Sequence, residues 1–266
     1  MEVANATQQK HFVLVHGAGH GAWCWYKLKS LLESSRHKVT AIDLATSGVN
    51  PKRLDEVDTL QDYCLPLLEL MAAIPQDDKV IVVGHSYGGF CIALAMDLYP
   101  KKISIGVFIG SIMPDSTHPP IYFFNQYYEW NPDGDDSPDT KVETYGCPDQ
   151  PRTVIHFGPI YLSTKLYQNC TSEEIELAKV LVRPVTLFSE DLSKLKAFSE
   201  EGYGSVKRGY IICSEDKAFP VGLQHWLVDN VGVSEVKEIK GADHMPMISK
   251  PQELCQCLVE IAEKVV

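Results

Sequence analysis

Short apolar runs alternate along this chain with longer stretches of helical periodicity. The apolar runs lie at residues 11–15, 39–43, 79–83, 103–109, 209–213 and 236–239. The helical stretches lie at residues 22–33, 59–74 and 89–96, and two more begin at residues 221 and 251. Continuously apolar strands that alternate with helices are typical of a mostly parallel sheet buried on both faces. The pattern therefore predicts an α/β fold in which helices flank a central sheet.

One region, from residue 114 to about residue 205, interrupts this alternation. Prolines punctuate it, an acidic tract occupies residues 133–136, and helix-like stretches follow at residues 159–169 and 172–181. A long irregular surface loop is one reading, but loops of this length without structure of their own are uncommon. We predict a cap subdomain, residues 114–205, inserted into a single α/β domain that spans residues 1–266. Its aromatic residues suit the roof of an apolar substrate pocket.

Composition narrows the class of partner. The chain has 266 residues, 45% of them hydrophobic and 22% charged, which is enough apolar surface for a substantial core. A formal charge of −11 argues against nucleic acid or an anionic membrane as the main partner. No apolar run approaches the length of a membrane span.

Leader and cysteine usage point to a reducing compartment. Residues 1–9 lack the basic and apolar regions of a signal peptide, so we expect a flexible N-terminus and a cytoplasmic location. The eight cysteines include no C-x-x-C pair, so we expect no structural zinc site.

The pentapeptide Gly84-His85-Ser86-Tyr87-Gly88 joins an apolar run to a helical stretch. A G-x-S-x-G sequence between a buried strand and a helix is the pattern of a nucleophile elbow, in which the serine hydroxyl is exposed on a strained turn. We expect His85 to point to the opposite side of this turn and to pack structurally. Three matching positions can arise by chance, so the assignment of Ser86 as a nucleophile needs a base, an acid and an oxyanion hole.

A candidate acid and a candidate base follow in the order found in α/β hydrolases. Asp216 comes directly after the run at residues 209–213, and His244 comes directly after the run at residues 236–239. Both positions fit the rule that sites in open parallel sheets lie at the carboxyl ends of the strands. Glu215 and Asp243 are nearby carboxylates. Asp243 adjoins the histidine, which makes it a poor partner for the imidazole and a plausible loop-bonding residue.

The loop after the first apolar run supplies a candidate oxyanion hole. His16-Gly17-Ala18-Gly19 resembles the H-G-x-G form, so we assign the two backbone donors to the amides of Ala18 and Tyr87. A dinucleotide-binding turn is the alternative, but the G-x-G-x-x-G fingerprint is absent. His20 either lines the pocket or has an outer structural role. This chemistry needs no metal or cofactor.

Six short motifs resemble one family of plant enzymes. The motifs are HFVLVHG at residues 11–17, WYKLK at 25–29, MPD at 113–115, LYQNC at 166–170, GSVKR at 204–208 and ADHM at 242–245. The chain resembles the plant methylesterase family of α/β hydrolases, which includes methyl salicylate esterases, polyneuridine aldehyde esterase and hydroxynitrile lyases. The similarity runs from about residue 10 to residue 262 and weakens between residues 118 and 157. It implies the α/β-hydrolase fold and the triad Ser86, Asp216 and His244.

The resemblance also implies a small-molecule ester as substrate and leads us to expect a homodimer. The leader most resembles the family members that act on alkaloid esters, which implies a monoterpenoid indole alkaloid methyl ester. An acid product with a β-carbonyl group would then lose CO2 spontaneously. A methyl salicylate or methyl jasmonate esterase, a hydroxynitrile lyase and a ligand receptor of this fold are the alternatives.

Two departures from the lyases favour ester hydrolysis. Lyase relatives carry Thr or Asn where this chain has Gly17, and many carry Lys where it has Met245. A lysine can hold cyanide as an anion and a thioether cannot, while a glycine leaves the oxyanion site uncrowded. We predict substrate contacts at both of these positions, Gly17 and Met245. We also predict them at His20, which lies close to the oxyanion loop, and at Tyr87, which adds bulk beside the pocket.

Overall fold

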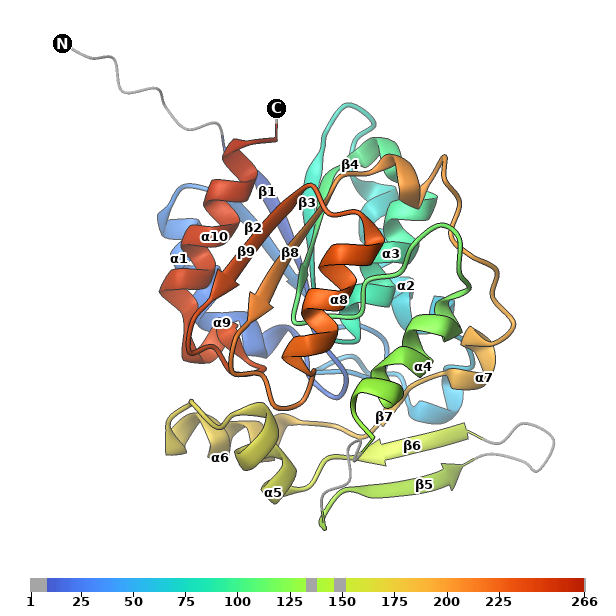
Figure 1. Cartoon of the computed structure of the whole chain (residues 1–266), viewed down its shortest axis with the longest axis vertical. Coiled ribbons are helices and arrows are strands. Elements are labelled where there is room, and N and C mark those ends of the chain that lie inside the picture. Colours follow the sequence, from blue (N-terminus) through green and yellow to red (C-terminus); the bar gives the residue numbers. More distant parts are fainter. Residues whose placement is uncertain (1–8, 133–137, 146–151, 266) are drawn as a thin grey trace.

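A computed structural model describes residues 9–132, 138–145 and 152–265 (Figure 1). Its central sheet has six strands in the order β2-β1-β3-β4-β8-β9, and every pair of neighbours is parallel. The strands are β1 (His11–Val15), β2 (Lys38–Ile42), β3 (Val80–His85), β4 (Ile103–Ile109), β8 (Arg208–Cys213) and β9 (Glu235–Ile239). The predicted α/β-hydrolase fold with a mostly parallel central sheet is confirmed.

Alternating side chains of the strands are buried on both faces of this sheet. In β1, Phe12 and Leu14 belong to one core cluster, whereas Val13 and Val15 belong to the other. Successive residues of a strand point to opposite faces, so a strand covered on both sides must be apolar at every position. This requirement explains the continuous apolar runs of the sequence.

Helices cover the two faces (Figure 1). One face packs against α1 (Tyr26–Ser34), α9 (Pro246–Ser249) and α10 (Pro251–Glu263), which contribute Leu28, Met247 and Leu254 to the Phe12 cluster. The other packs against α2 (Leu60–Ala73), α3 (Gly88–Leu98) and α8 (Val221–Val231). A 3-10 turn at Ala22–Trp25 precedes α1, so the helical stretch predicted at residues 22–33 is divided.

The chain between β4 and β8 forms further elements. The helices are α4 (Pro120–Trp130), α5 (Pro159–Tyr161), α6 (Ser172–Leu181) and α7 (Ser189–Leu192), with a π-helical turn at Leu162–Leu166 and a 3-10 turn at Tyr203–Ser205. An antiparallel sheet joins β5 (Lys141–Tyr145), β6 (Arg152–His156) and β7 (Val185–Thr186). Figure 1 shows α5, α6, β5 and β6 beyond the end of the central sheet to which β8 and β9 point.

The cap subdomain with the bounds 114–205 stays a prediction. Its acidic tract at residues 133–136 lies outside the described residues, as does the predicted flexible N-terminus apart from Gln9. The loops after β1, β3, β8 and β9 meet at the carboxyl edge of the sheet, where open parallel sheets place their sites.

Candidate active site

Ser86 lies at the sharp turn between β3 and α3. Its φ of 54° falls in the left-handed region, which a non-glycine residue rarely adopts, so the turn is strained. The Ser86 N–H donates to the carbonyl of Ile109 in β4, which ties the turn to the sheet (3.2 Å). A Cβ at Gly88 would lie 2.6 Å from the carbonyl oxygen of His16. Glycine at this position thus lets the elbow approach the loop after β1 closely.

Asp216 and His244 form a buried pair. The His244 Nδ1–H donates to Asp216 Oδ2 over 2.8 Å, and the two side chains are 5% and 0% exposed. The other carboxylate oxygen of Asp216 accepts from the N–H groups of Ala218 and Phe219, at 2.9 and 2.7 Å. These bonds orient the carboxylate toward the imidazole. They leave His244 Nε2 available as a base, and both His244 and Ser86 line the same cavity.

Gln224 binds the Asp216 carboxylate of this pair, and it was not predicted from the sequence. The side chain is fully buried and donates to Asp216 Oδ2 (3.3 Å) and to the carbonyl of Phe219 (2.9 Å). Its oxygen accepts from the N–H of Cys213 at the end of β8 (2.9 Å). A signal was present in the sequence, since Gln224 is a polar residue between the apolar Val221 and Leu227 on one helical stripe.

His85 packs structurally, as expected, and it also lines the cavity, which its sequence position did not predict. Its Nε2–H donates to the carbonyl of His244 over 2.7 Å, and the centres of the two rings are 4.6 Å apart. The ring both packs structurally and lines the cavity. Burial, with the neighbouring His244 adding to it, lowers the pKa of His85 well below its usual value, so the ring is neutral.

The loop after β1 brings Gly17 and Ala18 to the cavity wall. His16 Nδ1–H donates to the Gly17 carbonyl over 2.8 Å, while its Nε2 accepts the N–H of Leu44 over 3.1 Å. Burial lowers the pKa of His16 to about 4, which keeps this tautomer neutral. In a trans peptide the C=O and the N–H point in opposite directions, so His16 also fixes the direction of the Ala18 N–H.

Within residues 9–132, 138–145 and 152–265, neither the Ala18 N–H nor the Tyr87 N–H donates to another protein group. Tyr87 additionally marks the start of α3, where the helix dipole favours negative charge. Two free amides at one cavity are what an oxyanion hole requires.

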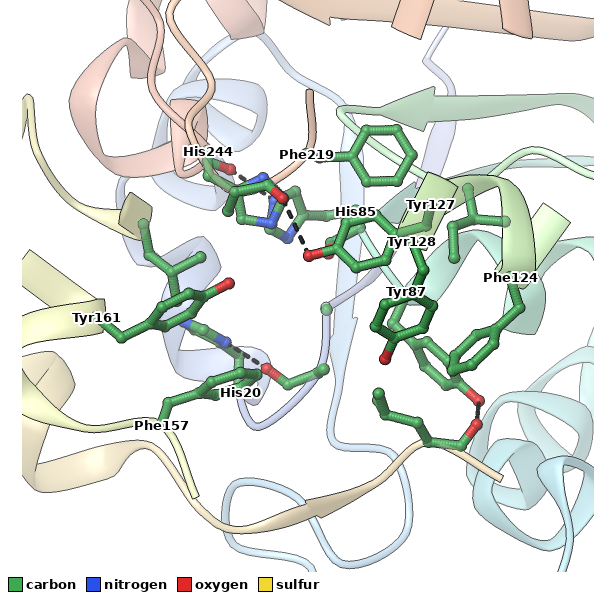
Figure 2. Close-up of a pocket in the computed structure, with 17 residues that line it drawn as sticks. His20, His85, Tyr87, Phe124, Tyr127, Tyr128, Phe157, Tyr161, Phe219 and His244 are labelled. Atoms are coloured by element: carbon green, nitrogen blue, oxygen red, sulfur yellow. Dashed lines mark hydrogen bonds between the residues drawn. The ribbon is translucent and has the colours of Figure 1, made fainter. Parts of the chain in front are cut away.

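His20 combines the two roles that its sequence position left open. Its side chain lines the cavity, and its Nδ1–H donates to the carbonyl of Ala18 over 2.8 Å (Figure 2). Its Nε2 accepts the hydroxyl of Tyr167 over 2.6 Å. Burial lowers the pKa of His20 to about 3, so the ring is neutral and works by hydrogen bonding rather than by charge.

The cavity is walled mainly by aromatic rings. Its empty space, mouth included, is about 610 Å³. Figure 2 shows His244 on one side of an open centre, with these rings around it: Phe124, Tyr127, Tyr128, Phe157, Tyr161 and Phe219. In the part of the chain that the structure describes, no Asp, Glu, Lys or Arg lines this cavity. The site therefore favours a largely apolar ligand held by ring faces.

Met245 does not line this cavity. Its side chain is fully buried in the Phe12 core cluster. The substrate contact at Met245 stays a prediction, and the side chains that line the cavity do not include it. Gly17, His20 and Tyr87, by contrast, all line the pocket.

No group of three His, Cys, Asp or Glu side chains among the described residues is arranged to hold a metal ion. Of the helices described here, none has the length and hydropathy needed to cross a membrane. The homodimer and the cytoplasmic location stay predictions.

Comparison with known proteins agrees with this geometry. Residues 12–256 match the model of the alpha/beta hydrolase family. The chain is 88% identical to norfluorocurarine synthase 2 from a Strychnos species, over the whole of both chains. It is 55% identical to polyneuridine aldehyde esterase from Rauvolfia serpentina, with 98% of each chain covered.

A crystal structure of polyneuridine aldehyde esterase superimposes with a TM-score of 0.93 at 55% identity, covering 96% of this chain and all of that one. Methylesterases are also among the relatives, one of them 47% identical over 96% of this chain. With its buried Asp216–His244 pair beside Ser86, the chain belongs to the α/β hydrolase family, in its plant methylesterase group of ester hydrolases.

Proposed function

We propose that this protein hydrolyses the methyl ester of a monoterpenoid indole alkaloid. The observation that carries the proposal is the convergence of Ser86, His244 and two free backbone amides on one aromatic cavity. Aromatic faces suit a rigid polycyclic substrate, and they also attract a basic nitrogen through cation–π contacts. The alkaloid class is supported by the names of the relatives at 88% and 55% identity.

The proposed reaction runs through an acyl-enzyme. Ser86 Oγ attacks the ester carbonyl while His244 Nε2 accepts its proton, and Asp216 stabilises the imidazolium that forms. The amides of Ala18 and Tyr87 bind the oxyanion. His244 then gives the proton to the leaving methoxide, and methanol departs. Water attacks the acyl-enzyme while His244 accepts a proton from it, and His244 returns that proton to Ser86 Oγ as the acid is released.

Loss of CO2 follows when the acid carries a carbonyl group on its β carbon. The bond between the α carbon and the carboxyl carbon breaks, and its electron pair forms the enol double bond. The carboxyl proton moves to the β-carbonyl oxygen, and the enol then becomes the carbonyl product. The overall change is one ester and one water converted into methanol, CO2 and the decarboxylated product.

The test is a substrate comparison with purified protein. An indole-alkaloid methyl ester with a β-carbonyl group should release equal amounts of methanol and CO2, measured by mass spectrometry and gas chromatography. Methyl salicylate, methyl jasmonate and methyl indole-3-acetate should turn over more slowly. Faster turnover of one of these would assign the protein to that ester instead, and cyanide release from mandelonitrile would make it a lyase.

The control is Ser86→Ala, which removes the nucleophile and leaves the fold intact. We expect its turnover to fall by roughly 10⁶-fold, to background. Activity near that of the wild type in this variant would refute the assignment of Ser86.

A further inference from the structure

The segment Leu166–Cys170, one of the motifs that resemble the methylesterases, has no role in the chemistry described so far. It begins at the last residue of the π-helical turn, and the Tyr167 N–H donates to the Leu162 carbonyl over 2.9 Å. Leu166 lines the cavity, and Tyr167 is fully buried. The segment thus passes directly behind the active site.

Its first contact is with the loop that follows β1. The Tyr167 hydroxyl donates to His20 Nε2 over 2.6 Å, and the two rings stack with centres 5.9 Å apart. His20 in turn donates to the Ala18 carbonyl. Tyr167 therefore holds the oxyanion loop through His20.

Its second contact is with the loop that follows β8. The side-chain amide of Gln168 donates to the carbonyl of Glu215 over 2.6 Å. The side-chain amide of Asn169 donates to the Glu215 carboxylate over 2.9 Å. Glu215 directly precedes Asp216, so both bonds hold the loop that carries the catalytic acid.

Its third contact is with the loop that follows β9. The Asn169 N–H donates to Asp243 Oδ2 over 3.0 Å, and its side-chain amide donates to the Gly241 carbonyl over 3.1 Å. The other oxygen of Asp243 accepts the N–H of Met245 over 3.0 Å. Asp243 is fully buried and directly precedes His244, and it binds Met245, which directly follows His244. The segment is thus connected to the chain on both sides of His244.

The sheet pairs β8 with β9, so it places the Asp216 loop beside the His244 loop, but it does not join either of them to the β1 loop. In the strand order, β3 and β4 lie between β1 and β8, which separates the β1 loop from the β8 loop by about 14 Å at the usual strand spacing. We propose that Leu166–Cys170 is a positioning segment, whose hydrogen bonds hold the oxyanion loop, the Asp216 loop and the His244 loop in register. This proposal rests on the proposed ester hydrolysis.

Two variants test it, each with a matched control. Tyr167→Phe removes only the hydroxyl that binds His20, and Asn169→Ala removes the amide that binds the other two loops. Tyr203→Phe is the control for the first, because it removes a buried hydroxyl that donates to the Pro114 carbonyl away from the cavity. Asn230→Ala is the control for the second, because among the described residues its side-chain amide donates to the Trp226 carbonyl on α8 and to no other group.

The first readout is kcat per active site on p-nitrophenyl acetate, with active sites counted by a fluorophosphonate that labels the nucleophile. We expect both variants to lose about tenfold in kcat, since small misplacements of catalytic groups cost up to about 100-fold. KM and the fraction of labelled sites should stay near wild type, and both controls should keep the wild-type kcat. A variant that loses only thermal stability, at unchanged kcat per site, would overturn the proposal.

The second readout is hydrogen exchange by mass spectrometry, which does not depend on catalysis. Tyr167→Phe should speed exchange in peptides that cover residues 16–20, and Asn169→Ala in peptides that cover residues 213–218 and 241–245. Wild-type exchange in these peptides would also overturn the proposal. A wild-type protein that hydrolyses no ester would contradict the proposed function alone, since the exchange result still decides whether the segment holds the loops.

Discussion

Gly17→Ala should strongly impair catalysis, because there is no room for a side chain at this position. An added Cβ would lie 2.8 Å from Ser86 Cβ, 3.0 Å from His85 Nδ1 and 3.3 Å from the His85 carbonyl oxygen. Neither neighbour can easily retreat. Ser86 is fixed on a strained turn, and the His85 ring is held by its hydrogen bond to the His244 carbonyl.

The magnitude follows from which group must move. Ordinary carbon contacts need about 3.5–4.0 Å, so the loop must withdraw from Ser86 by several tenths of an ångström or more. The Ala18 amide moves with it. Complete loss of one oxyanion donor costs about 10²–10³ in kcat, so partial displacement of this amide should cost about 10–100-fold. KM should change little, because the amide acts mainly on the charge of the transition state.

The assay is steady-state hydrolysis of p-nitrophenyl acetate, normalised to the sites that react with a fluorophosphonate. Gly209→Ala is the matched control, since a Cβ there would have its nearest neighbour at an ordinary 3.6 Å, in β8 and away from the carboxyl edge. We expect this control to keep the wild-type kcat. A kcat for Gly17→Ala within about twofold of wild type would refute the argument, because a displaced amide must weaken transition-state binding.

Three further predictions concern the groups behind the cavity. Gln224→Leu strands the Cys213 N–H, so the free energy of unfolding should fall by about 1–3 kcal/mol, and an unchanged Tm would contradict this. His16→Ala should lower kcat about tenfold, because it removes the shorter of two hydrogen bonds to the Gly17 carbonyl and leaves only the one from the His20 N–H at 3.3 Å. His16→Asn, whose amide can donate from nearly the same place, should recover most of that loss. Burial lowers the pKa of His16 to about 4 and that of His20 to about 3, against 6.5 in the unfolded chain. Below pH 6.5 the unfolded chain therefore binds protons that the folded chain does not. As the pH falls below 6.5, the free energy of unfolding measured in urea should decrease by up to about 1.4 kcal/mol per pH unit for each histidine. His16→Asn should show a shallower slope, and equal slopes would disprove the buried neutral state.

The sequence predicted the strands of the central sheet best, because each continuous apolar run corresponds to one strand. Each predicted strand appears within a residue or two of its expected bounds, because a strand covered on both faces must be apolar throughout. The order of the loops was equally readable. Ser86, Asp216 and His244 each follow a strand, and parallel strands bring their carboxyl ends to one edge.

The polar groups that hold the catalytic loops were harder to predict, because their partners are distant in sequence. Nothing near His85 indicates that its Nε2–H meets the carbonyl of His244, 159 residues later. The bond between Tyr167 and His20 crosses 147 residues, and it depends on how the region between β4 and β8 folds over the sheet. The carboxylate of Asp243 was an exception. Its place beside His244 suggested loop bonding, and it does bind the Met245 N–H.

The choice between ester hydrolysis and cyanohydrin cleavage depends on Gly17 more than on Met245. Met245 is fully buried in the core, and its side chain does not line the cavity. Gly17 is different, because its Cβ position lies 2.8 Å from the Cβ of Ser86. Ester hydrolysis requires a tetrahedral carbon bonded to Ser86 Oγ, with its oxyanion against the Ala18 amide. Cleavage of a cyanohydrin requires only that the triad remove a proton. A side chain at position 17 would occupy the space that the covalent intermediate needs and leave a general base functional. Glycine at this position therefore favours the covalent route.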